Sequence, residues 1–191
     1  MGGRACDRKI NDSQTNAVSG TYCEKSLKFA TLNVCGLKSK LLLPEFHSFV
    51  SNFDIIGIQE SKTDSLEILD IPGYKMLGKH RKHVARRKKS GGIIVAYRNS
   101  LDKYIIPIET ESKLVLWFKI TNSLTKCGDI ICGVVYIPPE YSEYALENPH
   151  GVIEEEFRRI SINCTSVIML GNFNSRTRNL PDFVLLDFDI F

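Results

Sequence analysis

The sequence predicts an α/β domain built from packed layers of strands and helices. Five short apolar runs, each bounded by turn residues and rich in isoleucine and valine, are typical of strands buried on both faces. Two other segments carry apolar residues at helical spacing and alternate with the strands along the chain. With 191 residues, 43% of them hydrophobic, the chain is long enough for one domain with a substantial core.

Residues 1–26 are polar, rich in Asn, Ser, Thr and Gly, and contain few large apolar side chains. Such a segment buries too little surface to offset the entropy lost on ordering, so we predict a flexible N-terminal arm. The predicted folded domain comprises residues 27–191, and its first strand is the alternating stretch 27–34.

The first helix is predicted within residues 41–53, where Pro44 suits a first helical turn. Its apolar face consists of Phe46, Phe49, Val50 and Phe53. The five apolar runs that predict strands are 54–60, 90–99, 113–121, 129–139 and 166–174. A second helix is predicted over 151–163, with an apolar face made of Val152, Ile153, Phe157 and Ile160.

Polar side chains stand at the ends of several of these strands. They are Asn33, Glu60, Tyr136, Asn172 and Asn174. If the strand ends converge, one edge of the domain carries a carboxylate, a phenol and three amides, which is a common arrangement for a ligand site. Taken singly, Glu60 is equally compatible with a solvated strand end, Asn33 with a turn, and Tyr136 with packing.

Taken in order, the segments "LNVCGL", "IGIQE", "SGGIIVAYR", "GVVYIPP" and "GNFNSRT" resemble the endonuclease/exonuclease/phosphatase (DNase I-like) superfamily. The resemblance extends from about residue 28 to 190, and "NSRT" with the later "LPDFVLLD" resembles most the endonuclease domain of non-LTR (LINE-type) retrotransposons. It implies a four-layer α/β sandwich that hydrolyses DNA phosphodiester bonds with a divalent metal.

The resemblance also implies a role for each strand-end residue. Glu60 matches the metal-binding glutamate of the family and Asn33 the amide beside it, and the implied cofactor is Mg²⁺ or Mn²⁺. Tyr136 matches a tyrosine that donates a hydrogen bond to the scissile phosphate. Asn174 matches an amide that holds the phosphate or the attacking water.

Two departures from the family pattern bear on activity. Asn172 stands where the family has an aspartate that deprotonates the attacking water, and an amide has no proton-accepting state. The family domain also continues to a Ser-Asp-His motif, whereas no histidine follows Asn174 here, so we expect a sandwich that is incomplete at its C-terminal end. We hypothesise an impaired or catalytically inactive remnant that at most binds nucleic acid. A further alternative keeps the superfamily but takes RNA, inositol phosphates or lipids as substrate.

Residues 79–89 contain seven Lys or Arg, two His and no acidic residue. A solvated loop, a contact to the DNA backbone and a nuclear localisation signal all explain such a cluster, and we favour the DNA contact. The candidate nucleic-acid-binding residues are Arg81, Lys82, Arg86, Arg87, Lys88 and Lys89.

Several other classes are disfavoured. No 18-residue apolar stretch predicts a membrane span, and the N-terminus lacks the apolar region of a secretory signal. Six scattered cysteines show no zinc-site spacing, which favours reduced thiols in the nucleus or cytoplasm. No P-loop, dinucleotide fingerprint or G-x-S-x-G elbow is present, so no small-molecule cofactor is expected.

Overall fold

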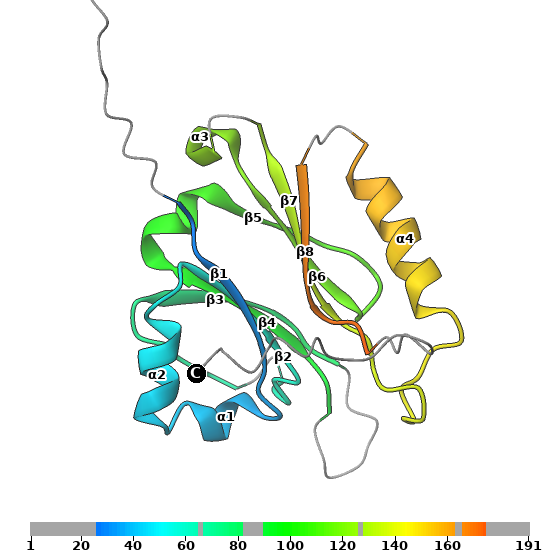
Figure 1. The fold of residues 1–191 in the computed structure, drawn as a ribbon, viewed down its shortest axis with the longest axis horizontal. Coiled ribbons are helices and arrows are strands. Elements are labelled where there is room, and N and C mark those ends of the chain that lie inside the picture. Colours follow the sequence, from blue (N-terminus) through cyan, green and yellow to red (C-terminus); the bar gives the residue numbers. More distant parts are fainter. Residues whose placement is uncertain (1–25, 65–66, 82–89, 126–127, 163–165, 175–191) are drawn as a thin grey trace, which may run out of the picture.

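The computed structural model describes residues 26–64, 67–81, 90–125, 128–162 and 166–174. Within them two four-stranded sheets pack face to face, and helices cover their outer faces (Figure 1). This arrangement confirms the predicted mixed α/β fold with two sheets.

The first sheet has the strand order β1-β2-β4-β3. Its strands are β1 (Phe29–Asn33), β2 (Ile55–Gln59), β3 (Tyr74–Lys79) and β4 (Ile93–Arg98). Strands β1 and β2 are parallel, and β4 runs antiparallel to both β2 and β3. The outer face of this sheet is covered by α1 (Leu37–Lys40) and α2 (Pro44–Val50) (Figure 1).

The second sheet has the strand order β5-β6-β7-β8. Its strands are β5 (Ile105–Ile108), β6 (Val115–Ile120), β7 (Ile130–Tyr136) and β8 (Ser166–Asn172). Strands β7 and β8 are parallel and the other pairs are antiparallel. Helix α4 (Pro149–Ile160) packs on the outer face, and the short helices η1 (Asn99–Tyr104) and α3 (Asn122–Thr125) lie in connections.

The largest apolar cluster lies between the two sheets and contains Ile55, Val95, Phe118 and Val134. Alternation along β2 places Ile55 in this cluster and Ile56 and Ile58 in the cluster beneath α2. All five residues of β2 are buried, as predicted for a strand covered on both faces. Gly57 allows the sheets to approach, because a Cβ there would lie 2.7 Å from Val134 Cγ1.

Both predicted helices form, with different boundaries. Helix α2 begins at Pro44 and buries Phe46 and Val50, but Phe49 is 38% exposed, and its ring lies 5.1 Å from that of Phe53 at a tilt of 52°. Helix α4 begins two residues earlier than expected because Asn148 Oδ1 accepts a hydrogen bond from Gly151 N at 2.9 Å. Its predicted apolar face packs on the second sheet as expected.

Two strands were not anticipated from the sequence, and both lie at a sheet edge. Strand β3 carries two lysines and a glycine, and it is buried mainly at its two ends. Strand β5 has only four residues and contains Pro107, which an edge strand tolerates because one side makes no ladder hydrogen bonds. Strand β3 therefore lacks the apolar run of a central strand, and in β5 the run is short and interrupted by proline.

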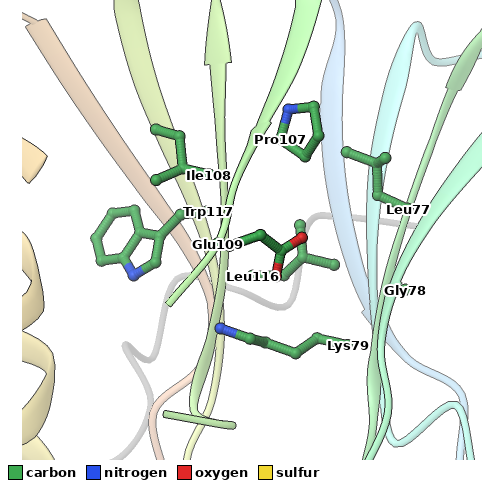
Figure 2. Close-up of a pocket in the computed structure, with 8 residues that line it drawn as sticks. All are labelled: Leu77, Gly78, Lys79, Pro107, Ile108, Glu109, Leu116 and Trp117. Atoms are coloured by element: carbon green, nitrogen blue, oxygen red, sulfur yellow. The ribbon is translucent and has the colours of Figure 1, made fainter. Parts of the chain in front are cut away.

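Two buried charged side chains connect the layers. Lys79 reaches from β3 across to the second sheet, where its Nζ donates to Val115 O at 3.0 Å and to Thr110 Oγ1 at 2.6 Å (Figure 2). Burial lowers the pKa of this lysine. Glu156 ties α4 to the second sheet by accepting hydrogen bonds from Trp117 Nε1 and Ser112 N, each at 3.0 Å. A small cavity of about 110 Å³ opens beside Lys79 between the edge strands (Figure 2).

The predicted arm at residues 1–26 lies almost wholly outside the described residues, as does the segment 175–191 on which the predicted C-terminal incompleteness depends. Those two expectations therefore stay predictions. Among the helices of the described ranges, none has the length and apolar character that a bilayer crossing requires.

Candidate active site

Asn33 and Glu60 lie side by side at the ends of two neighbouring strands. Parallel pairing sets Asn33 opposite Gln59, so Glu60 follows one residue beyond the paired end of β2. Asn33 Nδ2 donates to Glu60 Oε1 at 2.9 Å, and Asn33 Oδ1 accepts from Cys35 N at 3.1 Å. The amide therefore orients the carboxylate and is itself fixed by the turn that follows β1.

The backbone around Glu60 is held in a strained conformation. In the described ranges only four non-glycine residues have a positive φ, and three of them are Cys35 (49°), Glu60 (49°) and Lys62 (51°). Each such residue costs roughly 1–2 kcal/mol. Hydrogen bonds from Gly36 N to Glu60 O (2.8 Å) and from Lys62 N to Gly91 O (2.8 Å) hold these turns in place. Strain of this kind clusters at functional sites, which makes this edge the leading candidate.

Tyr136 ends β7 and faces the same edge. Burial raises the pKa of its phenol to about 12, and the negative charge of the nearby Glu60 adds to the shift. The phenol is therefore protonated at neutral pH and available as a hydrogen-bond donor. Glu60 and Tyr136 come from different sheets, so the site is formed where the two sheets meet.

Asn172 and Asn174 lie beside Tyr136, at the end of β8. Asn172 is the register partner of Tyr136, and its Oδ1 accepts from Asn174 N at 3.0 Å. Asn174 is the fourth residue with a positive φ (44°), and its Nδ2 donates to Ile137 O at 2.6 Å. Within the described residues neither amide is hydrogen-bonded to Glu60, so the structure places Asn172 beside Tyr136 without a direct hydrogen bond from either amide to the carboxylate.

A second charged side chain, Lys62, was not anticipated from the sequence. Lys62 Nζ lies 3.9 Å from Glu60 Oε2 and donates to Cys35 Sγ at 3.0 Å. The hydrogen bond to Cys35 raises the pKa of Lys62, outweighing the opposing effect of burial, and the Glu60 charge adds to the rise. The sequence shows only that a lysine stands two residues after Glu60. It does not show that the ammonium group turns towards the Glu60 carboxylate.

Arg81 is the described member of the predicted nucleic-acid-binding residues. Its guanidinium carbon lies 5.4 Å from the ring centroid of Tyr136 and 4.9 Å from that of Tyr144. Burial lowers the pKa of Arg81, while the negative charge of Glu60 acts in the opposite direction. The other predicted members, Lys82, Arg86, Arg87, Lys88 and Lys89, lie outside the described residues.

A cavity of about 290 Å³ adjoins Asn174. Its walls come from the end of β7, the residues after β8 and the segment that leads into α4. The polar or charged side chains that line it are Glu140, Glu147, His150 and Asn174. The candidate site therefore has open space next to it on the side of the second sheet.

The residues present fit a hard divalent cation that is bound together with a substrate phosphate. Glu60 offers carboxylate oxygens, and its side chain is 21% exposed. The described ranges contain no cluster of three or more His, Cys, Asp and Glu side chains that would enclose an ion completely. Mg²⁺ is commonly held by one or two carboxylates, with water and phosphate completing its shell, so a single carboxylate suffices in chemical terms.

Comparisons with known proteins agree with this architecture. Residues 30–187 match the sequence model of the Endonuclease/Exonuclease/phosphatase family. No curated protein sequence matches the chain.

Among solved structures, a mannosyl-6-phosphatase of Bacteroides thetaiotaomicron is 18% identical, with a TM-score of 0.50 over 78% of this chain and 66% of that protein. An AP endonuclease from Archaeoglobus fulgidus is 17% identical, with a TM-score of 0.49 over 76% of this chain and 56% of that protein. The Neisseria 3′ phosphatase NExo bound to a product DNA hairpin is 18% identical, with a TM-score of 0.48 over 78% of this chain and 58% of that protein. The chain thus spans less than two thirds of the length of these proteins.

Proposed function

The chain belongs to the endonuclease/exonuclease/phosphatase family, and from this membership we propose that it is a hydrolase of DNA phosphodiester bonds, of the retrotransposon endonuclease type. One observation carries the proposal. Glu60, Asn33 and Tyr136, which come from both sheets, converge at one edge, where the strained backbone at Glu60 is held by hydrogen bonds. The retrotransposon type rests on the resemblance of "NSRT" and "LPDFVLLD" alone.

Each side chain has a chemical task in this proposal. Glu60 would bind Mg²⁺ or Mn²⁺, which supplies neutralisation of the charge that develops on the phosphate. Asn33 orients the Glu60 carboxylate through the 2.9 Å hydrogen bond. Tyr136, whose pKa of about 12 keeps it protonated, would donate a hydrogen bond to a phosphate oxygen. Asn174 would hold the phosphate or the attacking water with its remaining amide hydrogen or its oxygen.

DNA is proposed as the substrate because the segment 79–89 is strongly basic and polyanions are attracted to such clusters. Lys79 does not contribute to this attraction, since its ammonium group points into the protein. Arg81 stands at the candidate site itself. The remaining basic residues of the segment are assigned to DNA contact on the sequence alone.

Asn172 supports a second candidate, a catalytically inactive protein that at most binds nucleic acid. Its Oδ1 already accepts a hydrogen bond from Asn174 N, and an amide cannot take a proton from water. Loss of general-base assistance costs roughly 10²- to 10⁴-fold in rate. Asn172 can hold a water molecule but cannot activate it.

The experiment that separates the two candidates is nicking of supercoiled plasmid DNA in Mg²⁺ by the chain and by Asn172→Asp. We expect slow nicking by the chain and an increase of roughly 10²-fold or more on introducing the carboxylate. Adding Glu60→Gln to Asn172→Asp should abolish the gain and serves as the metal-site control. Absence of nicking by both proteins, together with retained DNA binding, would favour the second candidate. Equal rates would show that residue 172 is not the base.

A further inference from the structure

Arg81 is the only described cation of the basic segment that reaches the candidate site. Its guanidinium lies against the rings of Tyr136 and Tyr144, which come from β7 and from the connection that precedes α4. A cation close to an aromatic face gains roughly 0.5–2 kcal/mol, depending on its desolvation. Two such contacts restrict the position of the Arg81 guanidinium far more than that of an arginine side chain exposed at the surface.

Gly91 also lies against this guanidinium, in addition to the two tyrosine rings. A Cβ at Gly91 would lie 2.7 Å from Arg81 Cζ, which is closer than two carbon atoms can approach. Gly91 also has a φ of +63° and accepts a hydrogen bond from Lys62 N at its carbonyl. The absence of a side chain at this position therefore makes room for Arg81 at the turn that supports Glu60.

The N–H groups of Arg81 remain available to a ligand. Across the described ranges the guanidinium makes no hydrogen bond and no ion pair, and it lies near the two rings and against Gly91. The negative charge of Glu60 nevertheless acts on it. A guanidinium that is held near two aromatic rings, with no acceptor among the described residues, keeps its planar N–H fork for a ligand, and this fork is the geometry that binds phosphate oxygens.

We infer that Arg81 binds a non-bridging oxygen of the phosphate that is to be cleaved, and that Tyr136, Tyr144 and Gly91 hold it in position for that contact. This inference rests on the proposed function for the identity of the anion. It separates Arg81 from the other basic residues of 79–89, which would contact phosphates away from the reaction. It also gives Tyr136 a second task, since the same ring that carries the donor phenol supports the guanidinium.

Binding measured without a divalent cation tests the contact independently of turnover. The probe is a fluorescein-labelled 20-base-pair DNA duplex, and its affinity is measured by anisotropy over a range of NaCl concentrations. Arg81→Ala should weaken binding roughly 10- to 100-fold and should lower the slope of log affinity against log salt by about 0.9, the value for one phosphate contact. Arg81→Lys should retain the slope while losing part of the affinity, because a lysine keeps the charge but not the fork.

Lys103 offers a matched control, because its ammonium lies 4.8 Å from the ring centroid of Tyr104 in η1, in another part of the fold. Lys103→Ala should leave both slope and affinity unchanged. An unchanged slope in Arg81→Ala would overturn the phosphate contact. A loss of slope of the same size in Lys103→Ala would overturn it equally, because the effect would then be one of net charge.

The role of Gly91 in positioning Arg81 is tested by comparing it with Gly73, because both glycines have a positive φ. Gly91→Ala adds a methyl group against Arg81, whereas Gly73→Ala, at a φ of +84°, adds one where no atom lies within 4 Å. Both variants should lose stability, but only Gly91→Ala should reproduce the binding defect of Arg81→Ala. Equal affinities of the two alanine variants would overturn the holding role.

Tyr144→Ala should weaken DNA binding, and Tyr144→Phe should recover most of that loss because it keeps the ring. Equal binding by the two Tyr144 variants would overturn the part assigned to that ring. If Arg81→Ala lowers the salt slope by about 0.9 but the chain never nicks a plasmid in Mg²⁺, the hydrolase proposal fails while Arg81 as a phosphate ligand stands. If nicking occurs and Arg81→Ala lowers neither the slope nor kcat, the arginine inference fails while the hydrolase proposal stands.

Discussion

Asn33 Nδ2 donates a hydrogen bond to Glu60 Oε1 at 2.9 Å and so joins two strand ends that are 27 residues apart in the sequence. The contact leaves Glu60 Oε2 on the side of Lys62, whose Nζ is 3.9 Å away. The carboxylate is thus oriented by an amide on one side and balanced by an ammonium group on the other. This relationship is the basis of the metal role proposed for Glu60.

Asn33→Ala should weaken binding of Mn²⁺ by roughly 10- to 100-fold, the usual effect of removing a partner that orients a metal ligand. Asn33→Asp should instead strengthen binding, because two carboxylates would then face one cation. Isothermal titration calorimetry with MnCl₂ measures both. Asn52→Ala is the control, since the Asn52 amide is bonded to Ser48 O in α2 and not to the site. Equal affinities for all variants would contradict the role of Asn33.

Gly57→Ala should destabilise the fold by about 1–3 kcal/mol, because its new Cβ would lie 2.7 and 2.8 Å from the two methyl groups of Val134. Val134→Ala removes those methyl groups, so the double variant should be more stable than the sum of the single effects predicts. Urea unfolding of the four proteins gives the coupling energy. Strict additivity would show that the sheets separate locally instead of clashing.

The buried Glu156 predicts a specific dependence of stability on pH. Burial alone would raise its pKa, but hydrogen bonds from Trp117, Ser112 and Thr110 outweigh burial and hold the pKa below 4.5. The unfolded chain therefore binds the proton more readily than the folded one. The stabilising contribution is fully present above pH 4.5 and is lost as the pH falls through the lower folded-state pKa.

Glu156→Gln should cost roughly 1–3 kcal/mol at pH 7, because the amide keeps one oxygen for one of the N–H groups of Trp117 and Ser112 while its NH2 faces the other. It should also reduce the fall in the free energy of unfolding between pH 6 and pH 3. Glu155→Gln, one residue earlier on the exposed face of α4, should do neither. An unchanged pH dependence in Glu156→Gln would contradict this assignment.

Tyr74→Phe should destabilise the protein by about 1–2 kcal/mol. The Tyr74 hydroxyl lies 2.9 Å from Val50 O and 2.6 Å from Phe53 O, and it anchors the end of α2 to the first sheet. Amide hydrogen exchange should quicken first in α2. Tyr141→Phe, at a side chain that is 93% exposed, is the control and should change neither stability nor exchange. Equal effects of the two substitutions would contradict the anchoring role.

The central strands were predictable because burial on both faces requires an uninterrupted apolar run, as in β2 and β4. The edge strands β3 and β5 escaped prediction because their exposed positions tolerate lysine and proline. Phe49 shows that the apolar pattern of a helix also fails to predict the exposure of each side chain. Its spacing fits the apolar face, yet α2 ends at Val50 and leaves that side chain 38% exposed.

In the candidate site, too, some residues could be predicted from the sequence and others could not. Glu60 and Asn33 could be predicted to lie together because each stands at the end of a predicted strand, and neighbouring parallel strands end at the same edge. Lys62 and Tyr144 gave no comparable signal. Their roles depend on which way a side chain leaves a strained turn or a long connection, and adjacent residues do not encode that direction.

By itself, the sequence determined that polar groups would follow buried strands and that an amide, Asn172, would stand where the resembling family has a carboxylate. Both depend on local composition and spacing. Only the tertiary structure decided that the guanidinium of Arg81 would lie against two tyrosine rings and that a glutamate of one sheet would face a phenol of the other. Those contacts arise from the packing of two sheets whose separation is set by side chains far apart along the chain.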